Sequence, residues 1–152
     1  MQHKVTKSTK THGETGWKID SYRTPAAKAR ADALSGEIIA AAIEVHRQLG
    51  PGLLESVYRA CLVEELRLRG IAHRQELALP INYRGLLLEA GYRLDLLVED
   101  LVILELKSVQ RLEPIYKAQL LTYLRISGRW LGLLLNFNSD RLKNGLQRMV
   151  NG

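Results

Sequence analysis

Acidic and basic side chains interrupt two neighbouring apolar runs near the middle of this 152-residue chain. Asp95 lies in the first run, and Glu105-Leu106-Lys107 ends the second. Since successive side chains of a strand point to opposite faces, Glu105 and Lys107 would share one face, about 7 Å apart. Two carboxylates and an ammonium are costly to bury without a partner such as a metal ion. These residue types have the chemistry that metal-assisted hydrolysis of a phosphodiester needs.

Carboxylate oxygens are hard ligands, so the pair Asp95 and Glu105 favours Mg²⁺ or Mn²⁺ over softer metals. Such an ion would polarise a phosphate and lower the pKa of a bound water. Lys107 would then orient that water or offset negative charge in the transition state. The alternative interpretation is that all three are solvated charges on the open face of a half-exposed sheet.

The two apolar runs are expected to form one β-hairpin that turns at Glu99-Asp100. A two-residue loop would place Asp95 opposite Leu104 and leave Glu105 on the other face. A three-residue loop, or a bulge, would place Asp95 opposite Glu105 on one face. The turn has no glycine to make the longer loop easy. The metal-site hypothesis nevertheless requires that register.

The wider pattern of apolar residues predicts one α/β domain over 34–152, with the order α-α-β-β-β-α-β-α. Helices are expected over 35–49, 53–69, 113–126 and 139–150, and strands over 72–83, 90–98, 102–107 and 130–137. Ser35 would cap the first helix, and Ser139 or Asp140 the last. Pro80 indicates an edge or a break in the first strand.

Three further polar residues lie on the expected helices. Gln119 and Tyr123 are four residues apart, so they share one helical face. Alternatively, they form the polar edge of an amphipathic helix. Glu55 follows the helix break at Gly50-Pro51-Gly52, where a carboxylate could simply complement the helix dipole. His46 has no neighbouring His or Cys at zinc-site spacing and is interpreted as a packing or hydrogen-bonding residue.

Positive charge is concentrated at the N-terminus. The first 33 residues contain seven basic and three acidic residues, so they hold +4 of the formal net charge of +6. Their polar composition predicts a flexible basic extension. No apolar stretch reaches the roughly 18–20 residues of a membrane span, and the N-terminus lacks the apolar region of a secretory signal. A cytoplasmic protein is therefore expected, and its basicity suits a phosphate-bearing partner.

Several segments resemble, in order, those of the GxxExxY protein family. The resemblance starts with Gly52-Leu-Leu-Glu55-Ser-Val-Tyr58 and the preceding Glu44-Val-His46-Arg47-Gln-Leu-Gly-Pro-Gly52, and continues with Gly91-Tyr-Arg-Leu-Asp95, Glu105-Leu-Lys107, Ala118-Gln119-Leu-Leu-Thr-Tyr123 and Leu135-Asn-Phe-Asn138. It covers the chain from about Leu34 to the C-terminus. That family is similar to the PD-(D/E)xK nuclease superfamily, particularly its RecB-like branch with a Gln-x-x-x-Tyr motif.

This resemblance implies a restriction-endonuclease-like core, with a mixed central sheet flanked by helices. It implies that Asp95 and Glu105 are metal ligands, assisted by Glu55 and the carbonyl of Leu106, and that Lys107 is the catalytic lysine. Gln119 and Tyr123 would support the site or contact nucleic acid. The superfamily name calls for proline before the aspartate, where this chain has Leu94. The carboxylate itself is kept.

The expected function is a Mg²⁺-dependent nuclease acting on DNA, in repair, recombination or defence. Its products would carry a 5′-phosphate and a 3′-hydroxyl, as the resemblance implies. A homodimer would suit a double-strand or junction cutter. Two alternatives stay open from the sequence. The first is a catalytically silent module that binds nucleic acid or joins a complex, and the second is a structural protein whose charges are solvated.

Overall fold

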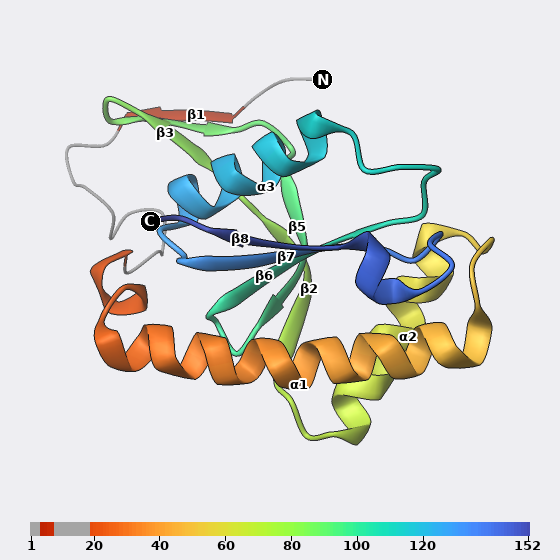
Figure 1. Ribbon diagram of the computed structural model, residues 1–152. Helices are drawn as coiled ribbons and strands as arrows, with labels where there is room; N and C mark the ends of the chain where they lie inside the picture. The colour runs from red at the N-terminus through yellow and green to blue at the C-terminus, as the bar shows by residue number, and fades with distance from the viewer. Residues whose placement is uncertain (1–3, 8–18) are drawn as a thin grey trace.

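A five-stranded sheet is the centre of the computed structural model, which describes residues 4–7 and 19–152 (Figure 1). In order across the sheet, its strands are β2 (His73–Ala78), β5 (Arg93–Val98), β6 (Val102–Lys107), β7 (Leu131–Asn136) and β8 (Leu146–Val150). β6 and β7 are parallel, and the other neighbours are antiparallel. A mixed sheet with helices on both faces confirms the predicted α/β class and restriction-endonuclease-like core.

Helices cover both faces of the sheet (Figure 1). α1 (Pro25–Leu49) and α2 (Glu55–Leu68) lie on one face, and α3 (Pro114–Ser127) lies on the other. Leu104 and Leu106 pack into the core beneath α1 and α2, as their alternation predicts. Ile103 packs with Leu120 of α3 on the opposite face. The odd-numbered positions of β6, Glu105 and Lys107 among them, therefore face α3.

The first helix begins ten residues earlier than predicted. Thr24, not Ser35, is its N-cap, and the Thr24 hydroxyl accepts a hydrogen bond of 3.1 Å from the Ala27 N–H. Pro25 follows in the first turn, where its fixed φ suits a helix. Ser35 lies inside the helix and donates to the Asp32 carbonyl over 2.7 Å. The alanine-rich start has strong helix propensity but few branched apolar residues, so it lacks the periodic signal.

The predicted flexible extension over 1–33 overlaps this helix, because residues 25–33 belong to α1. A short 3₁₀ helix, η2 (Ile19–Tyr22), precedes it. The remaining parts of the extension over 1–3 and 8–18 lie outside the described residues, so the division at residue 33 stays a prediction. β1 (Lys4–Lys7) pairs with β4 (Leu86–Glu89), which also pairs with β3 (Ile81–Tyr83). These three strands form a second, smaller sheet.

One predicted strand is divided in the structure, and another begins later than predicted. The strand predicted over 72–83 is β2 and β3, separated at Pro80, which has no N–H for a sheet ladder. The strand predicted over 90–98 begins as β5 at Arg93, and Gly91, with φ of +83°, separates it from β4. A turn at Arg84-Gly85 joins β3 to β4.

The predicted C-terminal helix over 139–150 is wrong. The chain forms a 3₁₀ helix, η3 (Leu142–Gly145), and then β8. A Cβ atom on Gly145 would overlap the Asn136 carbonyl oxygen and the Ser139 hydroxyl, so the chain passes the end of β7 closely here. Pairing of Leu146 with Leu135 then begins the antiparallel ladder that covers the outer edge of β7. Long-range pairing overrides the local helical pattern.

Within the described part of the chain, no helix combines the length and the apolar character needed to cross a membrane.

Candidate functional site

The register of the β5–β6 hairpin is the one that the metal-site hypothesis requires. Val98 pairs with Val102 and Leu96 with Leu104, so residues 99–101 form a three-residue loop. Continuing this register by one residue places Asp95 opposite Glu105. Both side chains therefore belong to the face of the sheet that α3 covers.

The loop reaches this length without glycine because two acidic residues adopt the left-handed conformation. Glu99 has φ of +46° and Asp100 has φ of +60°. The Leu101 N–H donates to the Val98 carbonyl over 2.9 Å and closes the turn. Non-glycine residues are strained at such angles, so surrounding contacts must hold them there.

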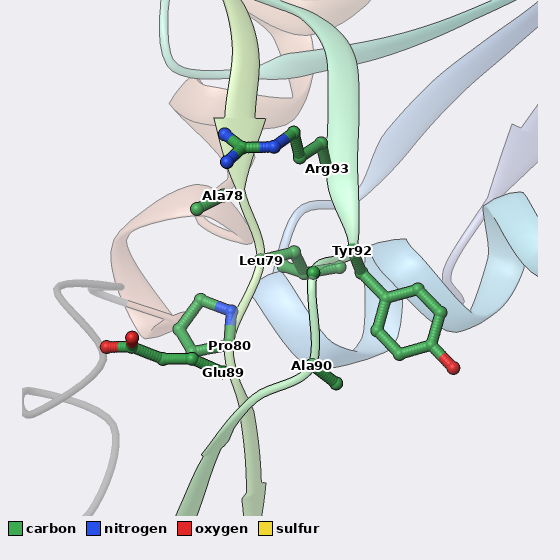
Figure 2. Close-up of a pocket in the computed structure, with 8 residues that line it drawn as sticks. Ala78, Leu79, Pro80, Glu89, Ala90, Tyr92 and Arg93 are labelled. Atoms are coloured by element: carbon green, nitrogen blue, oxygen red, sulfur yellow. The ribbon is translucent and has the colours of Figure 1, made fainter. Parts of the chain in front are cut away.

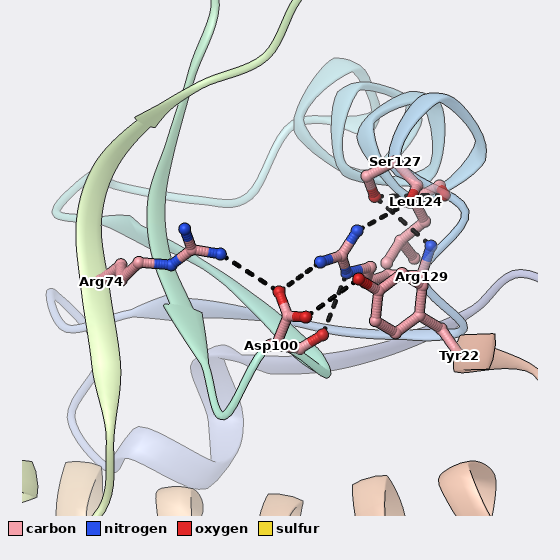
Figure 3. Close-up of polar contacts among 6 residues, drawn as sticks. All are labelled: Tyr22, Arg74, Asp100, Leu124, Ser127 and Arg129. Carbon is pink, nitrogen blue, oxygen red and sulfur yellow. Dashed lines mark hydrogen bonds and ion pairs between the residues drawn. The ribbon is translucent and has the colours of Figure 1, made fainter. Parts of the chain in front are cut away.

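Asp100 is held by groups from three other parts of the chain (Figure 3). The fully buried Arg129 donates from Nε to the Asp100 carbonyl over 3.1 Å and forms an ion pair with its carboxylate. The Tyr22 hydroxyl donates to Oδ2 over 2.9 Å, and Arg74 donates to Oδ1 over 3.2 Å. The Arg129 guanidinium also lies 3.6 Å from the centre of the Tyr22 ring. These contacts fix the loop that sets the register of the site.

At the other end of the hairpin, side-chain carboxylates replace backbone carbonyls as the acceptors between the two strands. The Leu106 N–H donates to Asp95 Oδ2 over 2.9 Å, and the Asp95 N–H donates to Glu105 Oε1 over 3.3 Å. Each carboxylate thus bonds to the opposite strand and is held in the space between β5 and β6. The N–H and C=O of one strand residue point the same way, so the Leu106 carbonyl is also directed toward this space.

The acidic pair is poorly solvated. Glu105 is only 6% exposed. Burial first, and then repulsion from Asp95, raise the pKa of Glu105 to about 9. The Arg59 guanidinium lies near Asp95, with Nη1 4.0 Å from Oδ1. No ion pair to Glu105 occurs among the described residues. Glu105 therefore favours its protonated form, because the surrounding side chains do not neutralise two ionised carboxylates.

Glu55 reaches the site from the start of α2. The buried Tyr58 hydroxyl donates to the Gly50 carbonyl over 2.5 Å and accepts from the Leu53 N–H over 3.1 Å. Ser108, just after β6, donates to the Leu53 carbonyl over 2.6 Å. These bonds hold the loop before α2 against the end of β6. Glu55 is then close enough to Asp95 to be affected by its charge: burial first, and that charge second, raise the pKa of Glu55.

Lys107 lies two residues after Glu105 in β6, on the same face of the sheet. Its charge opposes the rise in the pKa of both Glu55 and Glu105, so the ammonium is within electrostatic reach of both carboxylates. The ammonium nitrogen also lies 4.7 Å from the centre of the Tyr116 ring on α3, a cation–π arrangement.

Gln119 and Tyr123 approach from α3. The Gln119 side-chain amide donates to the Tyr123 hydroxyl over 2.8 Å. Burial first, and the charge of Glu105 second, raise the pKa of Tyr123, so this hydroxyl is within electrostatic reach of Glu105. Gln119 is exposed and Tyr123 is buried, so the two do not form a shared polar edge. The structure thus places Asp95 beside Glu105, with Lys107 and Tyr123 within electrostatic reach of Glu105, whereas Glu55 is not close enough to both acids to share a metal ion with them.

Three neighbours of the site carry no role in the sequence analysis. Arg59 is four residues after Glu55, and this helical spacing is a signal that could have identified it. Tyr116 lies beneath Lys107 and has no such signal in the sequence. Asn136 is the sheet partner of Lys107 and exchanges hydrogen bonds of 2.9 and 3.1 Å with the backbone of Val109. His46 bonds to the Ser139 carbonyl over 2.8 Å, as its interpretation predicts.

The donors at the site suit a hard divalent cation, although the side-chain set is small. Asp95 and Glu105 supply carboxylate oxygens, and such an ion would neutralise the charge that the pair carries when both carboxylates are ionised. No group of three or more His, Cys, Asp or Glu side chains is close enough to hold a metal within the described ranges. The Leu106 carbonyl and water would therefore have to complete the coordination.

Comparison with known proteins gives one match. A family model described as the PD-(D/E)XK nuclease superfamily matches residues 32–149, from within α1 to within β8. The matched region contains every predicted site residue. Neither the curated proteins nor the solved structures gave a match.

Proposed function

Because the chain belongs to the PD-(D/E)XK nuclease superfamily, we propose that it is a metal-dependent nuclease that hydrolyses phosphodiester bonds of DNA. Membership of the superfamily suggests nuclease chemistry and a nucleic-acid substrate, and its nucleases generally use divalent metal ions. DNA as the substrate, and Mg²⁺ or Mn²⁺ as the ion, are the finer parts of the proposal.

The observation that carries the proposal is the alignment of Asp95 with Glu105. A three-residue loop places them on one face, and hydrogen bonds to the opposite strand orient both carboxylates. Burying two adjacent acids costs stability when the Arg59 guanidinium lies 4.0 Å from Asp95 and no ion pair to Glu105 occurs among the described residues, so a purely structural role does not account for the pair. A bound divalent cation would remove that cost.

Each residue of the site has a proposed role. Asp95 and Glu105, with the Leu106 carbonyl, would hold the ion, and Glu55 would assist them from the start of α2. When bound, the ion would polarise the phosphate and lower the pKa of a water molecule. Lys107 would orient that water for in-line attack, leaving a 5′-phosphate and a 3′-hydroxyl.

The α3 residues would shape the site from the other side. The Gln119 amide donates to the Tyr123 hydroxyl, which leaves the hydroxyl proton free to point toward the acidic pair or the substrate. The bond also fixes the position of the Tyr123 hydroxyl. We propose that this pair supports the site or contacts nucleic acid.

The test is cleavage of single-stranded, duplex and branched DNA in the presence of Mg²⁺ or Mn²⁺. Lys107→Ala is expected to lower the rate by about a hundredfold or more, the scale of losing a group that assists proton transfer. The matched control is Lys143→Ala, which changes an exposed lysine of η3 and should leave the rate unchanged. Cleavage that survives Lys107→Ala unaltered would not originate from this site.

A second candidate function is a catalytically silent module that binds nucleic acid or joins a complex. The small set of metal-binding side chains favours it, because only two fully oriented carboxylates are available. This candidate expects DNA binding without turnover under every metal tested. Binding with no cleavage, by wild type and Lys107→Ala alike, would support it over the nuclease.

We further propose membership of the GxxExxY family and of the RecB-like branch. Gly52, Glu55 and Tyr58 support this assignment, because the Tyr58 hydroxyl fastens the glycine-containing loop that precedes Glu55. A cytoplasmic location and a role in DNA repair, recombination or defence belong to the same proposal. A homodimer would suit cleavage of both strands, and sedimentation velocity would test it.

A further inference from the structure

An open groove of about 730 Å³ lies beside the candidate site, between α3 and the segment around β3 and Tyr92. Its volume falls within the range of about 300–1,000 Å³ that ligand sites occupy. Three tyrosines line it: Tyr92, Tyr116 and Tyr123. Ile115, which is 67% exposed, extends the apolar lining toward the start of α3.

The aromatic rings are held in place by their surroundings. The centres of the Tyr92 and Tyr123 rings are 6.4 Å apart, and the rings are tilted by 56°. The backbone of Tyr92 is fixed, because its carbonyl accepts from the Leu79 N–H over 2.8 Å. Figure 2 shows the Tyr92 ring extending away from Pro80 and Glu89, which border a smaller cavity of about 270 Å³. Tyr92 thus presents a partly exposed ring on a rigid backbone.

The groove adjoins the candidate site through residues of α3. Gln119 and Tyr123, which are joined by a hydrogen bond, both line the groove. Tyr116 lines the groove and lies beneath the Lys107 ammonium. A ligand in the groove would therefore lie beside side chains of the candidate site.

Positive charge beside the groove comes from Lys107, whose ammonium nitrogen lies 4.7 Å from the centre of the Tyr116 ring. Lys117 of α3 lines a different pocket. The described residues that line the groove itself are apolar, aromatic or uncharged polar. Aromatic side chains beside positive charge are the combination that binds single-stranded nucleic acid, because every base has a face on which it can stack.

We propose that this groove binds unstacked bases next to the cleaved phosphodiester, so the substrate is single-stranded DNA or a single-stranded segment of a larger DNA. The inference rests on the proposed nuclease function and specifies its substrate class. Bases inside an intact duplex are stacked on one another and cannot offer their faces to Tyr92. A second copy of the chain is a less suitable occupant, since it would leave the adjoining carboxylates and lysine without a ligand.

The test measures equilibrium binding of fluorescent oligothymidylate, and of a duplex of equal length, by full-length protein in EDTA. Cleavage is suppressed under these conditions, so binding and catalysis are assessed separately. Tyr92→Ala is expected to weaken single-strand binding about tenfold, within the range for loss of one stacking side chain. Tyr92→Phe keeps the ring and should restore binding. Tyr83→Ala is the matched control, because Tyr83 is 61% exposed and lies outside the groove.

Tyr92 is 47% exposed, so its substitution should leave the fold intact, as a thermal melt would verify. Tighter binding of the single strand than of the duplex, lost in Tyr92→Ala and in Ile115→Ala, supports the proposal. Equal binding by wild type and both variants overturns it, as does a change of oligomeric state in place of DNA affinity. Metal-dependent duplex cleavage that is insensitive to Tyr92→Ala would sink this inference while leaving the nuclease proposal standing.

Discussion

The two ends of the β5–β6 hairpin carry acidic side chains in opposite electrostatic surroundings. At the turn, Asp100 accepts hydrogen bonds from Arg129, Tyr22 and Arg74 (Figure 3). At the open end, Asp95 and Glu105 lie beside each other, and the nearest guanidinium nitrogen is 4.0 Å from Asp95. One hairpin thus contains both a neutralised acid and an acidic pair without a full counter-charge.

The two ends differ in what neutralises their acidic groups. The charge of Asp100 is neutralised by partners from the chain itself. An ionised Glu105 would need a cation from outside, because burial and Asp95 together favour its protonated form. Variants at the two ends should therefore change different properties, the turn affecting stability and the open end affecting activity.

The largest expected effect is loss of cleavage in Glu105→Gln. The substitution keeps the size of the side chain but removes one of the two oriented carboxylates. We expect the rate to fall by about a hundred- to a thousandfold, the scale of removing one group that stabilises charge in a transition state. Metal-dependent cleavage of DNA measures it. Glu64→Gln, which changes an exposed glutamate of α2, is the control. Cleavage by Glu105→Gln at the wild-type rate would exclude Glu105 as a ligand.

At the turn, Arg129→Ala should destabilise the protein by about 3 kcal/mol or more, because it leaves Asp100 and the Ser127 carbonyl without their buried donor. Urea unfolding followed by circular dichroism measures this. Arg74→Ala removes an exposed partner of the same carboxylate and should cost under about 1 kcal/mol. Equal losses in the two variants would contradict the importance of the buried contacts.

Divalent cations should stabilise the open end. A metal ion at a hundred times its dissociation constant raises the free energy of unfolding by about 2.7 kcal/mol. We therefore expect Mg²⁺ or Mn²⁺ to raise the melting temperature of the wild type. Asp95→Asn should abolish the rise, whereas Asp140→Asn, at an exposed aspartate near η3, should retain it. A rise of equal size in both variants would place the ion elsewhere.

The smallest expected change is the slope of stability against pH in metal-free protein, counted per pH unit. The pKa of Glu105 is about 9 when folded, against an ordinary value of 4.5. The folded state therefore holds this proton where the unfolded state has lost it. Between these two values its contribution to stability falls as pH rises, by up to about 1.4 kcal/mol per pH unit. Unfolding measured across pH 5–9 should show a shallower slope in Glu105→Gln. Identical slopes would indicate that Glu105 ionises normally.

Local pattern predicted the hairpin well. The bounds of β6 and the turn at Glu99-Asp100 agree with the sequence analysis because alternating apolar residues and a polar turn are short-range signals. The three-residue loop was required by the site but was not expected from turn chemistry. Contacts from distant residues hold this loop, among them Arg129, which lies 29 residues from Asp100 and has no local signature.

The failures also have a common physical cause. The C-terminal segment is amphipathic enough for a helix, yet it forms β8 because the edge of β7 offers a ladder that only the folded chain contains. The start of α1 was missed because Thr24 and Pro25 precede a stretch without periodic apolar residues. Tyr92 and Tyr116 line the groove beside α3 from separate segments of the chain, and their spacing in the sequence does not reveal this.

The number of residues in the loop at 99–101 determines which side chains of β6 share a face with Asp95. Adding or deleting a single residue there would rotate β6 half a turn relative to β5, so that Glu105 and Lys107 exchange places with Leu104 and Leu106. Every chemical group would still be present, but Glu105 and Lys107 would point into the apolar layer beneath α1 and α2, away from Asp95. We therefore expect a one-residue insertion in this loop, away from the carboxylates, to abolish the proposed cleavage as completely as their removal.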